Sequence, residues 1–373
     1  MDEEVKRAIL EALEIWGNPS SAHEYGKQAK KVVNSARCQV AKAIGAKNPD
    51  DIIFTSGGTE ANNQVLLSLI KLHSSKVACP HLVTSNIEHD SIVLPLEKLV
   101  QEGKCKVSFV PVDRTTGFVQ PDAIAQACTR ETVLVTVMLA NNETGVIQPI
   151  SDIATAVKQR ANQLGTTIAI HTDAAQALGK IPVDVRQLQV DYLTIVGHKF
   201  YGPRIGALFV NFSNAVSLQA MFYGGGQERG FRPGTENTPM IAGLGKACEI
   251  ANPPPDDYLC QIRNCFESEM KAKLGNDSVK IHFSDSPRLP NTSSVAFPKL
   301  KKTSSELLHL ANSFIASSGA ACHSSSTKAS KILMACGIPE NLAARTIRFS
   351  FGKYTAMNDV QKVVEELVQL VQE

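Results

Sequence analysis

Residues Ile52–Asn63, IIFTSGGTEANN, contain the pattern that decides the fold of this 373-residue chain. A short apolar run with strong β propensity, Ile52–Thr55, leads into a polar turn with two glycines. Beyond the turn, apolar residues recur at helical spacing, at Val65, Leu66, Leu69 and Ile70. The stretch therefore predicts a strand, a tight turn and a helix.

The turn itself is suited to an anion. Glycine lets a ligand approach the backbone closely, and the N-terminus of the following helix presents free N–H groups and a positive dipole end. Thr59 adds a hydroxyl. The sequence does not match GxxxxGKS or GxxxxGKT, so a nucleotide-binding P-loop is not predicted. A plain structural connection remains the alternative at this point.

The same pattern of strand, turn and helix recurs along the chain. Six further apolar, β-rich runs lie at Leu82–Ser85, Val107–Val112, Val133–Leu139, Ile168–Thr172, Tyr192–Val196 and Ile205–Val210. Continuous apolar strands that alternate with helices predict an α/β fold with a mostly parallel seven-stranded sheet between helices. Such sheets bind their ligands beyond the carboxyl ends of the strands.

The segment Ala251–Asp257, ANPPPDD, is the clearest break, because three consecutive prolines cannot continue a helix or lie in a central strand. We expect a large domain over residues 1–250 and a smaller α+β domain over residues 251–373. In the smaller domain the sequence predicts helices at Tyr258–Leu274 and near Ser304–Asn312, strands at Thr292–Phe297, Ser313–Ala316 and Thr346–Ser350, and a final helix with an apolar stripe at Val360, Val363, Val364, Leu367, Leu370 and Val371.

Composition excludes several classes of protein. The chain has 38 Lys+Arg and 36 Asp+Glu, a formal charge of +2, so nucleic acid or an anionic membrane is not expected as the main partner. The amphipathic start, MDEEVKRAILEALEIWG, does not resemble a signal peptide. Nine cysteines without CxxC pairs or zinc-finger spacing predict neither a disulfide framework nor a metal site. A cytoplasmic location in the cytosol is the expectation.

Polar residues of unusual type follow three of the predicted strands. They are Asn86–Asp90, NIEHD, then Asp173–Gln176, DAAQ, and Gly197–Lys199, GHK. Each set alone is typical of an ordinary strand end. Together they supply a lysine for an imine, a carboxylate for a pyridine nitrogen, a flat ring for stacking and a cradle for phosphate. The combination predicts pyridoxal 5'-phosphate as cofactor.

These residues identify a family. The chain resembles the pyridoxal-phosphate-dependent cysteine desulfurases and selenocysteine lyases, class V aminotransferases with the type I aminotransferase fold. The resemblance covers almost the whole chain through GNPS (17–20), TSGGTE (55–60), Glu88-His89, ANNETG (140–145), HTDAAQ (171–176), GHKFYGPRIGALF (197–209), GGGQERGFRPGTEN (224–237), SGAAC (318–322) and IRFS (347–350). Within the family, the residues around these motifs are most similar to the selenocysteine lyase branch.

Two features depart from the family pattern. Many members carry serine where this chain has Val196, which removes one hydroxyl from the phosphate site. The family also opens with a strand before its first helix, whereas this chain begins at or inside that helix. Since the strand normally borders the active site, we expect its absence to affect activity.

The resemblance implies the residues that bind the cofactor ring. Lys199 binds the cofactor covalently and, in a desolvated setting, takes and returns the substrate α-proton. Asp173 pairs with the pyridine nitrogen, and Gln176 hydrogen-bonds the ring hydroxyl. His89 stacks on the ring, and Asn142 lies at its edge or beside the substrate.

The resemblance also implies residues for the phosphate and the substrate. Gly58, Thr59 and His198 bind the phosphate, and Thr235 reaches the phosphate of the other subunit, which implies a homodimer. Arg348 matches the fork for the substrate carboxylate, a task that suits the planar guanidinium.

Cys322 is the cysteine to which the resemblance gives a catalytic role. Its thiolate attacks the substrate sulfur in desulfurases, and in selenocysteine lyases it donates or relays a proton. Neighbouring His323 is a candidate to set its ionisation. Asp90 has two interpretations: a negative charge that disfavours cysteine as a substrate, or a helix N-cap.

The predicted activity is removal of selenium from L-selenocysteine, giving L-alanine and selenide or elemental selenium, with a selenium-accepting protein as a possible partner. The first alternative is a cysteine desulfurase that forms L-alanine and an enzyme persulfide. A non-catalytic scaffold with the same fold is the alternative from another class. A transaminase is less favoured because Cys322 would have no function in it.

Overall fold

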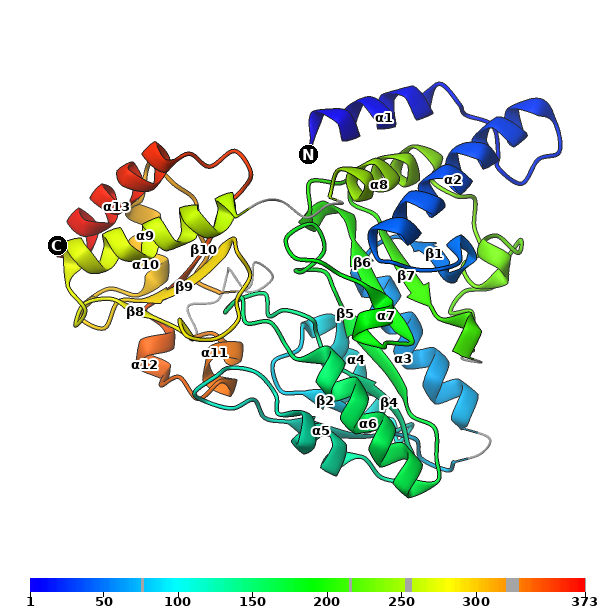
Figure 1. Ribbon diagram of the computed structural model, residues 1–373, viewed down its shortest axis with the longest axis horizontal. Helices are drawn as coiled ribbons and strands as arrows, with labels where there is room; N and C mark the ends of the chain where they lie inside the picture. The colour runs from blue at the N-terminus through cyan, green and yellow to red at the C-terminus, as the bar shows by residue number, and fades with distance from the viewer. Residues whose placement is uncertain (75–76, 215–216, 252–256, 320–328, 373) are drawn as a thin grey trace. The chain divides into compact units, whose positions relative to one another are not determined.

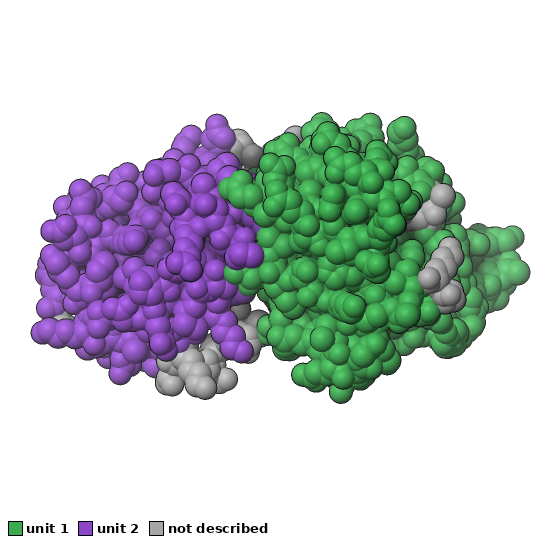
Figure 2. All heavy atoms as spheres, turned by 90° about the horizontal axis from the view of Figure 1, so that it is seen from below, with its two compact units in different colours: residues 1–110, 120–139, 149–254 green, residues 111–119, 140–148, 255–373 purple. Residues whose placement is uncertain are grey.

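The computed structural model describes residues 1–74, 77–214, 217–251, 257–319 and 329–372. The chain forms two compact units, coloured separately in Figure 2. Unit 1 contains residues 1–110, 120–139 and 149–254, and unit 2 contains residues 111–119, 140–148 and 255–373. Among the described residues, no helix has both the length and the apolar character needed to cross a membrane.

Unit 1 is built around a seven-stranded sheet with the order β1-β7-β6-β5-β4-β2-β3 (Figure 1). Strand β7 runs antiparallel to both of its neighbours, and the other neighbouring pairs are parallel. The strands are β1 (Ile52–Thr55), β2 (His81–Ser85), β3 (Lys106–Val110), β4 (Thr132–Thr136), β5 (Ala169–Asp173), β6 (Tyr192–Val196) and β7 (Gly206–Val210). The predicted α/β fold with a mostly parallel seven-stranded sheet is confirmed.

Helices cover both faces of this sheet (Figure 1). Helices α3 and α4 bury an apolar core against one face, in a cluster that includes Leu66, Ile92 and Leu134 of the interior strand β4. Helices α6 and α7 lie over the other face. The helices of unit 1 are α1 (Glu3–Leu13), α2 (Glu24–Ala43), α3 (Gly58–His73), α4 (Asp90–Gln101), α5 (Pro121–Ala127), α6 (Ile150–Leu164), α7 (Val185–Leu188) and α8 (Thr238–Ile250), with short 3-10 turns η1 (Pro49–Asp51), η2 (Gly197–Lys199), η3 (Phe212–Asn214) and η4 (Glu228–Gly230).

Unit 2 contains a three-stranded antiparallel sheet with the order β10-β9-β8. Helices α9 and α13 pack on it through a core that includes Phe266, Val295 and Leu367. Its elements are α9 (Tyr258–Leu274), β8 (Lys280–Ile281), β9 (Thr292–Ala296), α10 (Ser304–Leu310), α11 (Lys331–Ala335), α12 (Glu340–Ala343), β10 (Thr346–Ser350) and α13 (Met357–Gln372). The bounds predicted for α9 and β10 are confirmed to the residue.

The strand predicted at Ser313–Ala316 is wrong. The backbone N–H groups of Asn312 and Ser313 donate to the two carboxylate oxygens of Glu366, at 2.6 and 3.0 Å, and so do not enter a ladder at this point. Pairing is limited to a single bridge between Ser317 and Arg348. A side chain on α13 therefore takes the place of a strand partner.

Two short segments leave the large unit and join the small one. The segments are Pro111–Val119 and Ala140–Gln148, and both belong to unit 2. The prediction of a single break after residue 250 placed them in the large domain. The N–H of Ile147 donates to Pro287 at 2.9 Å, and the N–H of Leu289 donates to Gly145 at 2.8 Å. These backbone pairs join residues more than a hundred positions apart, so no local signal in the sequence reveals them.

A buried ion pair fixes η4 against the first strand. Arg37 of α2 makes two hydrogen bonds with the Glu228 carboxylate, at 2.8 and 2.5 Å, and donates to the carbonyl of Ile52 at 2.6 Å. Glu228 also accepts the N–H of Phe54 at 2.8 Å. Glu228 and Arg229 both have left-handed backbones, with φ of 48° and 57°, so these contacts hold a conformation that is unfavourable for side chains with a Cβ.

The Arg37→Met variant should lower the free energy of unfolding by ~3 to 5 kcal/mol, because it leaves the Glu228 carboxylate buried without a cation. Urea unfolding followed by circular dichroism measures the change. Lys98→Met is the matched control, because Lys98 pairs with Glu102 at the exposed surface and such pairs contribute about 1 kcal/mol or less. Equal losses in the two variants would contradict a special role for the buried pair.

Candidate functional site

The carboxyl ends of four strands in unit 1 carry most of the predicted site. Strands β1, β2, β5 and β6 point the same way in the sheet. Gly58 and Thr59 follow β1, and His89 follows β2. Asp173 ends β5, with Gln176 in the turn beyond it, and His198 and Lys199 follow β6 in η2. The predicted juxtaposition of these residue types at one edge of the sheet is present.

Helix α3 begins at this edge without a side-chain cap. Its N-cap is Gly57, an extended residue that offers no side-chain acceptor to the first N–H groups of the helix. A 16-residue helix that starts in this way can receive an anion at its N-terminus. Thr59 is exposed there, and its hydroxyl adds a further donor.

Gly58 is required by its contact with β6. A Cβ at this position would lie 2.6 Å from Cγ2 of Val196, which is too close for a carbon contact. The valine that replaces the family's serine is therefore accommodated by the glycine opposite it. The hydroxyl that serine would offer is replaced by apolar packing beneath the turn.

Glu60 connects the turn to the segment Gly224–Asn237. Its carboxylate accepts the N–H of Ser56 at 2.9 Å and hydrogen bonds from Arg232 at 2.9 and 3.4 Å. Burial raises the pKa of Glu60, but the hydrogen bonds from Arg232 and Ser56 outweigh it and hold the pKa below its ordinary value. The carboxylate thus stays charged and pairs with the arginine.

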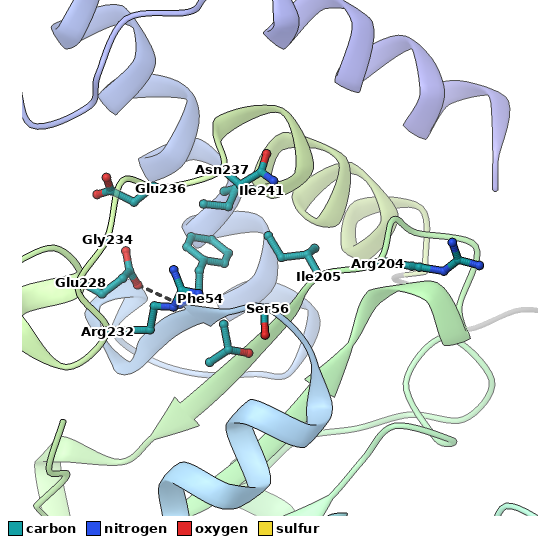
Figure 3. Close-up of a pocket in the computed structure, with 11 residues that line it drawn as sticks. Phe54, Ser56, Arg204, Ile205, Glu228, Arg232, Gly234, Glu236, Asn237 and Ile241 are labelled. Atoms are coloured by element: carbon teal, nitrogen blue, oxygen red, sulfur yellow. Dashed lines mark hydrogen bonds between the residues drawn. The ribbon is translucent and has the colours of Figure 1, made fainter. Parts of the chain in front are cut away.

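A cavity of about 160 Å³ lies beside this contact (Figure 3). Figure 3 shows Glu228, Arg232 and Glu236 along one side of the cavity and Ile205 along the other. Thr235 is exposed between two of the lining residues. Its predicted contact with a second subunit is not tested by a single chain and stays a prediction.

Hydrogen bonds orient the side chains of both Asp173 and His89. One carboxylate oxygen of Asp173, Oδ1, accepts the N–H of Ala175 at 2.9 Å, and Oδ2 accepts from Nδ2 of Asn62 at 2.8 Å. Nδ1 of His89 accepts the N–H of Ser91 at 3.1 Å and lies 2.8 Å from the Ser91 hydroxyl. Both side chains therefore have a fixed orientation at the edge of the sheet.

The N-cap of α4 is His89, so the interpretation of Asp90 as an N-cap is wrong. Asp90 is the first residue of the helix, where its negative charge faces the positive end of the dipole. Its proposed effect on substrate choice stays open. Aspartate is a common N-cap before an apolar run, which is why the sequence suggested Asp90. In the structure, Nδ1 of His89 accepts the hydrogen bond from the N–H of Ser91 that a capping carboxylate would accept.

Two residues of η2 differ in setting from what the sequence suggested. Lys199 is exposed, so the desolvated lysine that we expected is not produced by the surrounding chain. His198 is also exposed by surface area, but its imidazole is partly screened from water, and this burial, together with the positive charges of Lys199 and Arg204, lowers its pKa. A neutral imidazole that donates one hydrogen bond is therefore favoured next to the lysine. The side-chain oxygen of Gln176 accepts a hydrogen bond from Nζ of Lys180, four residues later in the chain, at 3.2 Å.

Unit 2 holds two further predicted residues together. Arg348 lies on β10, and its Nη1 donates to the carbonyl oxygen of Asn142 at 2.7 Å. The backbone of Arg348 pairs with Ser317 through bonds of 2.7 and 3.2 Å. Among the residues described, the buried Oδ1 of Asn142 has no hydrogen-bond partner. A buried amide oxygen in that state is suited to accept from a ligand. Cys322 and His323 lie outside the described residues.

Comparisons with known proteins show the family of this chain. A profile of the class V aminotransferases matches residues 1–363. Selenocysteine lyase from Xenopus tropicalis is 46% identical over an alignment that covers 99% of this chain and 90% of that protein. Cysteine desulfurase IscS from Dictyoglomus turgidum is 38% identical, with 99% and 92% covered. A solved structure described as a NifS-like protein matches 100% of this chain and 96% of its own, with 32% identity and a TM-score of 0.88.

The chain belongs to the class V aminotransferases. The predicted family and its fold are thus confirmed. The roles given to individual residues stay predictions, because the comparisons do not test them.

Several residues of this class V aminotransferase site were not singled out from the sequence. Asn62, Ser91 and Thr194 hydrogen-bond to one another or to the predicted residues, and Glu60 holds Arg232. Asn62 had a detectable signal, because it lies four residues after Gly58 and next to apolar positions of the same helix. A polar residue on the buried side of a helix needs partners, and those partners indicate a site.

Glu88 is a second buried group that the sequence interpretation left without a role. It is 2% exposed, and its carboxyl accepts from the Ser85 hydroxyl at 2.5 Å and from the N–H of Met138 at 3.1 Å. Burial raises the pKa of Glu88 to about 8, with a smaller contribution from the charge of Asp173. Near neutral pH the folded protein therefore holds a proton at this carboxyl.

Glu88 should make the folded protein less stable as the pH rises. Its pKa moves from 4.5 in the unfolded chain to about 8 in the folded one, so the stabilisation is full below the lower value and is lost as the pH approaches the higher one. Glu88→Gln cannot ionise at this position, so its free energy of unfolding should fall less than that of the wild type over this interval. The slopes of the two proteins should differ by at most ~1.4 kcal/mol per pH unit. Urea unfolding at several pH values measures it. The exposed Glu97→Gln on α4 should behave as wild type, and a parallel Glu88→Gln profile would contradict the raised pKa.

Proposed function

We propose that this protein is a pyridoxal 5'-phosphate-dependent lyase that converts L-selenocysteine into L-alanine and elemental selenium, or into L-alanine and selenide where a thiol reductant supplies the two electrons that selenide requires. The observation that carries the proposal is the meeting of a lysine, an aspartate, a histidine and an uncapped helix N-terminus at one edge of the sheet. The higher identity to a selenocysteine lyase than to a cysteine desulfurase supports selenocysteine as the substrate.

The described residues fit this cofactor. The N-terminus of α3 and His198 would hold the phosphate, and the fixed carboxylate of Asp173 would accept a hydrogen bond from the protonated pyridine nitrogen. His89 offers a flat ring whose orientation is set by Ser91. When bound, the cofactor supplies an electron sink that stabilises negative charge at the substrate α-carbon.

Three side chains of the protein would then act on the substrate. Lys199 would take the proton from the α-carbon and return a proton to the product. Arg348, with its guanidinium held at the Asn142 carbonyl, would bind the substrate carboxylate. Cys322 would deliver or relay a proton as selenium leaves. Thr235 would reach the phosphate of a second subunit in a homodimer, and a cytosolic location would supply the reduced conditions that a reactive thiol needs.

Alanine production tests the proposal directly. The purified protein, supplied with pyridoxal 5'-phosphate without oxygen, should form alanine from L-selenocysteine in clear preference to L-cysteine. Lys199→Ala should abolish this and the visible absorption of the bound cofactor, whereas the exposed Lys104→Ala should change neither. Comparable turnover of both substrates would instead support a cysteine desulfurase, and no cofactor absorption would favour a scaffold.

The Asp90→Lys variant tests whether Asp90 influences the choice of substrate. If its preference for L-selenocysteine over L-cysteine equals that of the wild type, Asp90 does not determine the preference.

Arg348→Lys should raise the KM for the amino-acid substrate about tenfold or more while changing kcat much less, because lysine cannot form the two parallel hydrogen bonds of a guanidinium. Steady-state alanine formation measures both constants. Arg345→Lys is the matched control, since Arg345 immediately precedes β10 and its guanidinium donates to the carbonyl of Pro298 at 3.0 Å. An unchanged KM in Arg348→Lys, or the same increase in both variants, would contradict the role of Arg348.

A further inference from the structure

Asn62 is the centre of a buried hydrogen-bond network beneath the site. It lies on α3, one turn after Gly58, and is fully buried. Its Nδ2 donates to Oδ2 of Asp173 at 2.8 Å and to the hydroxyl of Ser91 at 2.9 Å. Its Oδ1 accepts from the hydroxyl of Thr194 at 2.7 Å. Both amide donors and the amide oxygen are thus used.

The chemistry of the partners determines which way the amide of Asn62 faces. An ionised Asp173 can only accept hydrogen bonds, so the NH₂ group must point toward it. The oxygen then faces Thr194, whose single hydroxyl proton is donated to Asn62. Thr194 in turn lies 3.0 Å from Nε2 of His171, which must carry the proton of that contact.

The far end of the network is closed by a neutral histidine. Burial lowers the pKa of His171 to about 3, so the imidazole has one proton, on Nε2. Its Nδ1 accepts from the hydroxyl of Thr136 at 2.8 Å. The direction of each hydrogen bond is therefore fixed along the path from Thr136 on β4 through His171 and Thr194 to Asn62 on α3. A reversed amide of Asn62 does not fit this order of donors and acceptors.

The other branch of the network reaches the ring of His89. Ser91 accepts from Asn62, so its hydroxyl proton is free to be donated to Nδ1 of His89. The N–H of Ser91 donates to the same nitrogen. In its neutral form His89 therefore carries its proton on Nε2, and its ring is held from the side of Nδ1.

We propose that Asn62 is a positioning residue that holds the Asp173 carboxylate and, through Ser91, the His89 ring in one orientation relative to each other. The inference rests on the proposed function, in which these two groups contact the cofactor ring. Asn62 itself contacts neither cofactor nor substrate in this scheme. One buried amide would thus align two ring-binding groups, Asp173 at the end of β5 and His89 after β2.

Asn62→Ala removes both arms of the network. We expect the affinity for pyridoxal 5'-phosphate, measured by absorption titration of the cofactor-free protein, to fall about tenfold or more, as for lost hydrogen bonds to a charged group. The pH midpoint of the visible absorption of the bound cofactor should rise by about half a unit or more, because a misaligned Asp173 no longer keeps the ring nitrogen protonated. kcat should fall with little change in KM.

Asn63→Ala is the matched control on the same helix. Asn63 donates to the carbonyl of Thr59 at 2.8 Å and, over a longer 3.4 Å, to the backbone carbonyl of Ser91. Neither bond involves Asp173 or the Ser91 hydroxyl, so removal of the Asn63 amide should leave the cofactor affinity and the pH midpoint unchanged. If Asn62→Ala and Asn63→Ala give the same values, Asn62 has no positioning role. If the wild-type protein binds no cofactor, the proposed function fails instead, and the two failures are thus distinguishable.

Ser91→Ala separates the branches and serves where Asn62→Ala does not fold. It removes the hydroxyl between Asn62 and His89 but leaves the bond from Asn62 to Asp173. We expect a weaker cofactor affinity, by about threefold to tenfold, with an unchanged pH midpoint. A shifted midpoint in Ser91→Ala, or an unchanged affinity, would contradict the division of the network into an Asp173 arm and a His89 arm.

Discussion

The close packing of α3 on β6, at the contact between Gly58 and Val196, is the constraint on which the site depends. A side chain at Gly58 would push the start of the helix away from the strand, since even a Cβ would lie 2.6 Å from the valine. The same helix presents its uncapped N-terminus to the site, buries Asn62 one turn later and packs Leu66 and Leu69 into the core. One helix position thus determines the anion site, the hydrogen-bond network and part of the core.

Burial, rather than ion pairing, sets the electrostatics beneath the site. The pKa of Glu88 is raised and that of His171 is lowered, so both side chains are driven toward their neutral forms. A neutral network transmits orientation through hydrogen bonds without adding fixed charge next to Asp173. The buried ion pair of Arg37 and Glu228 performs a different task, because it fixes a strained turn of the backbone.

The sequence was sufficient for features that depend on local patterns. Apolar runs bounded by turn residues predicted the bounds of β1, β6, α9 and β10, and the strand ends predicted where the polar site residues gather. Features that depend on distant partners were not predictable in this way. Glu366 captures the backbone N–H groups at Ser313, and β8 is only two residues long. The sequence shows that Asn62 is a polar residue on the buried side of a helix, but its partners on β5, β6 and α4 are identified only when α3 lies on the sheet.

The two units hold their site residues by separate sets of contacts. Asp173 and His89 are oriented by α3 and α4 within unit 1, whereas Arg348 is oriented by Asn142 and Ser317 within unit 2. Changes in sets that share no partner usually add in free energy. The groups predicted to contact the cofactor ring are therefore held independently of the arginine that is predicted to bind the substrate carboxylate.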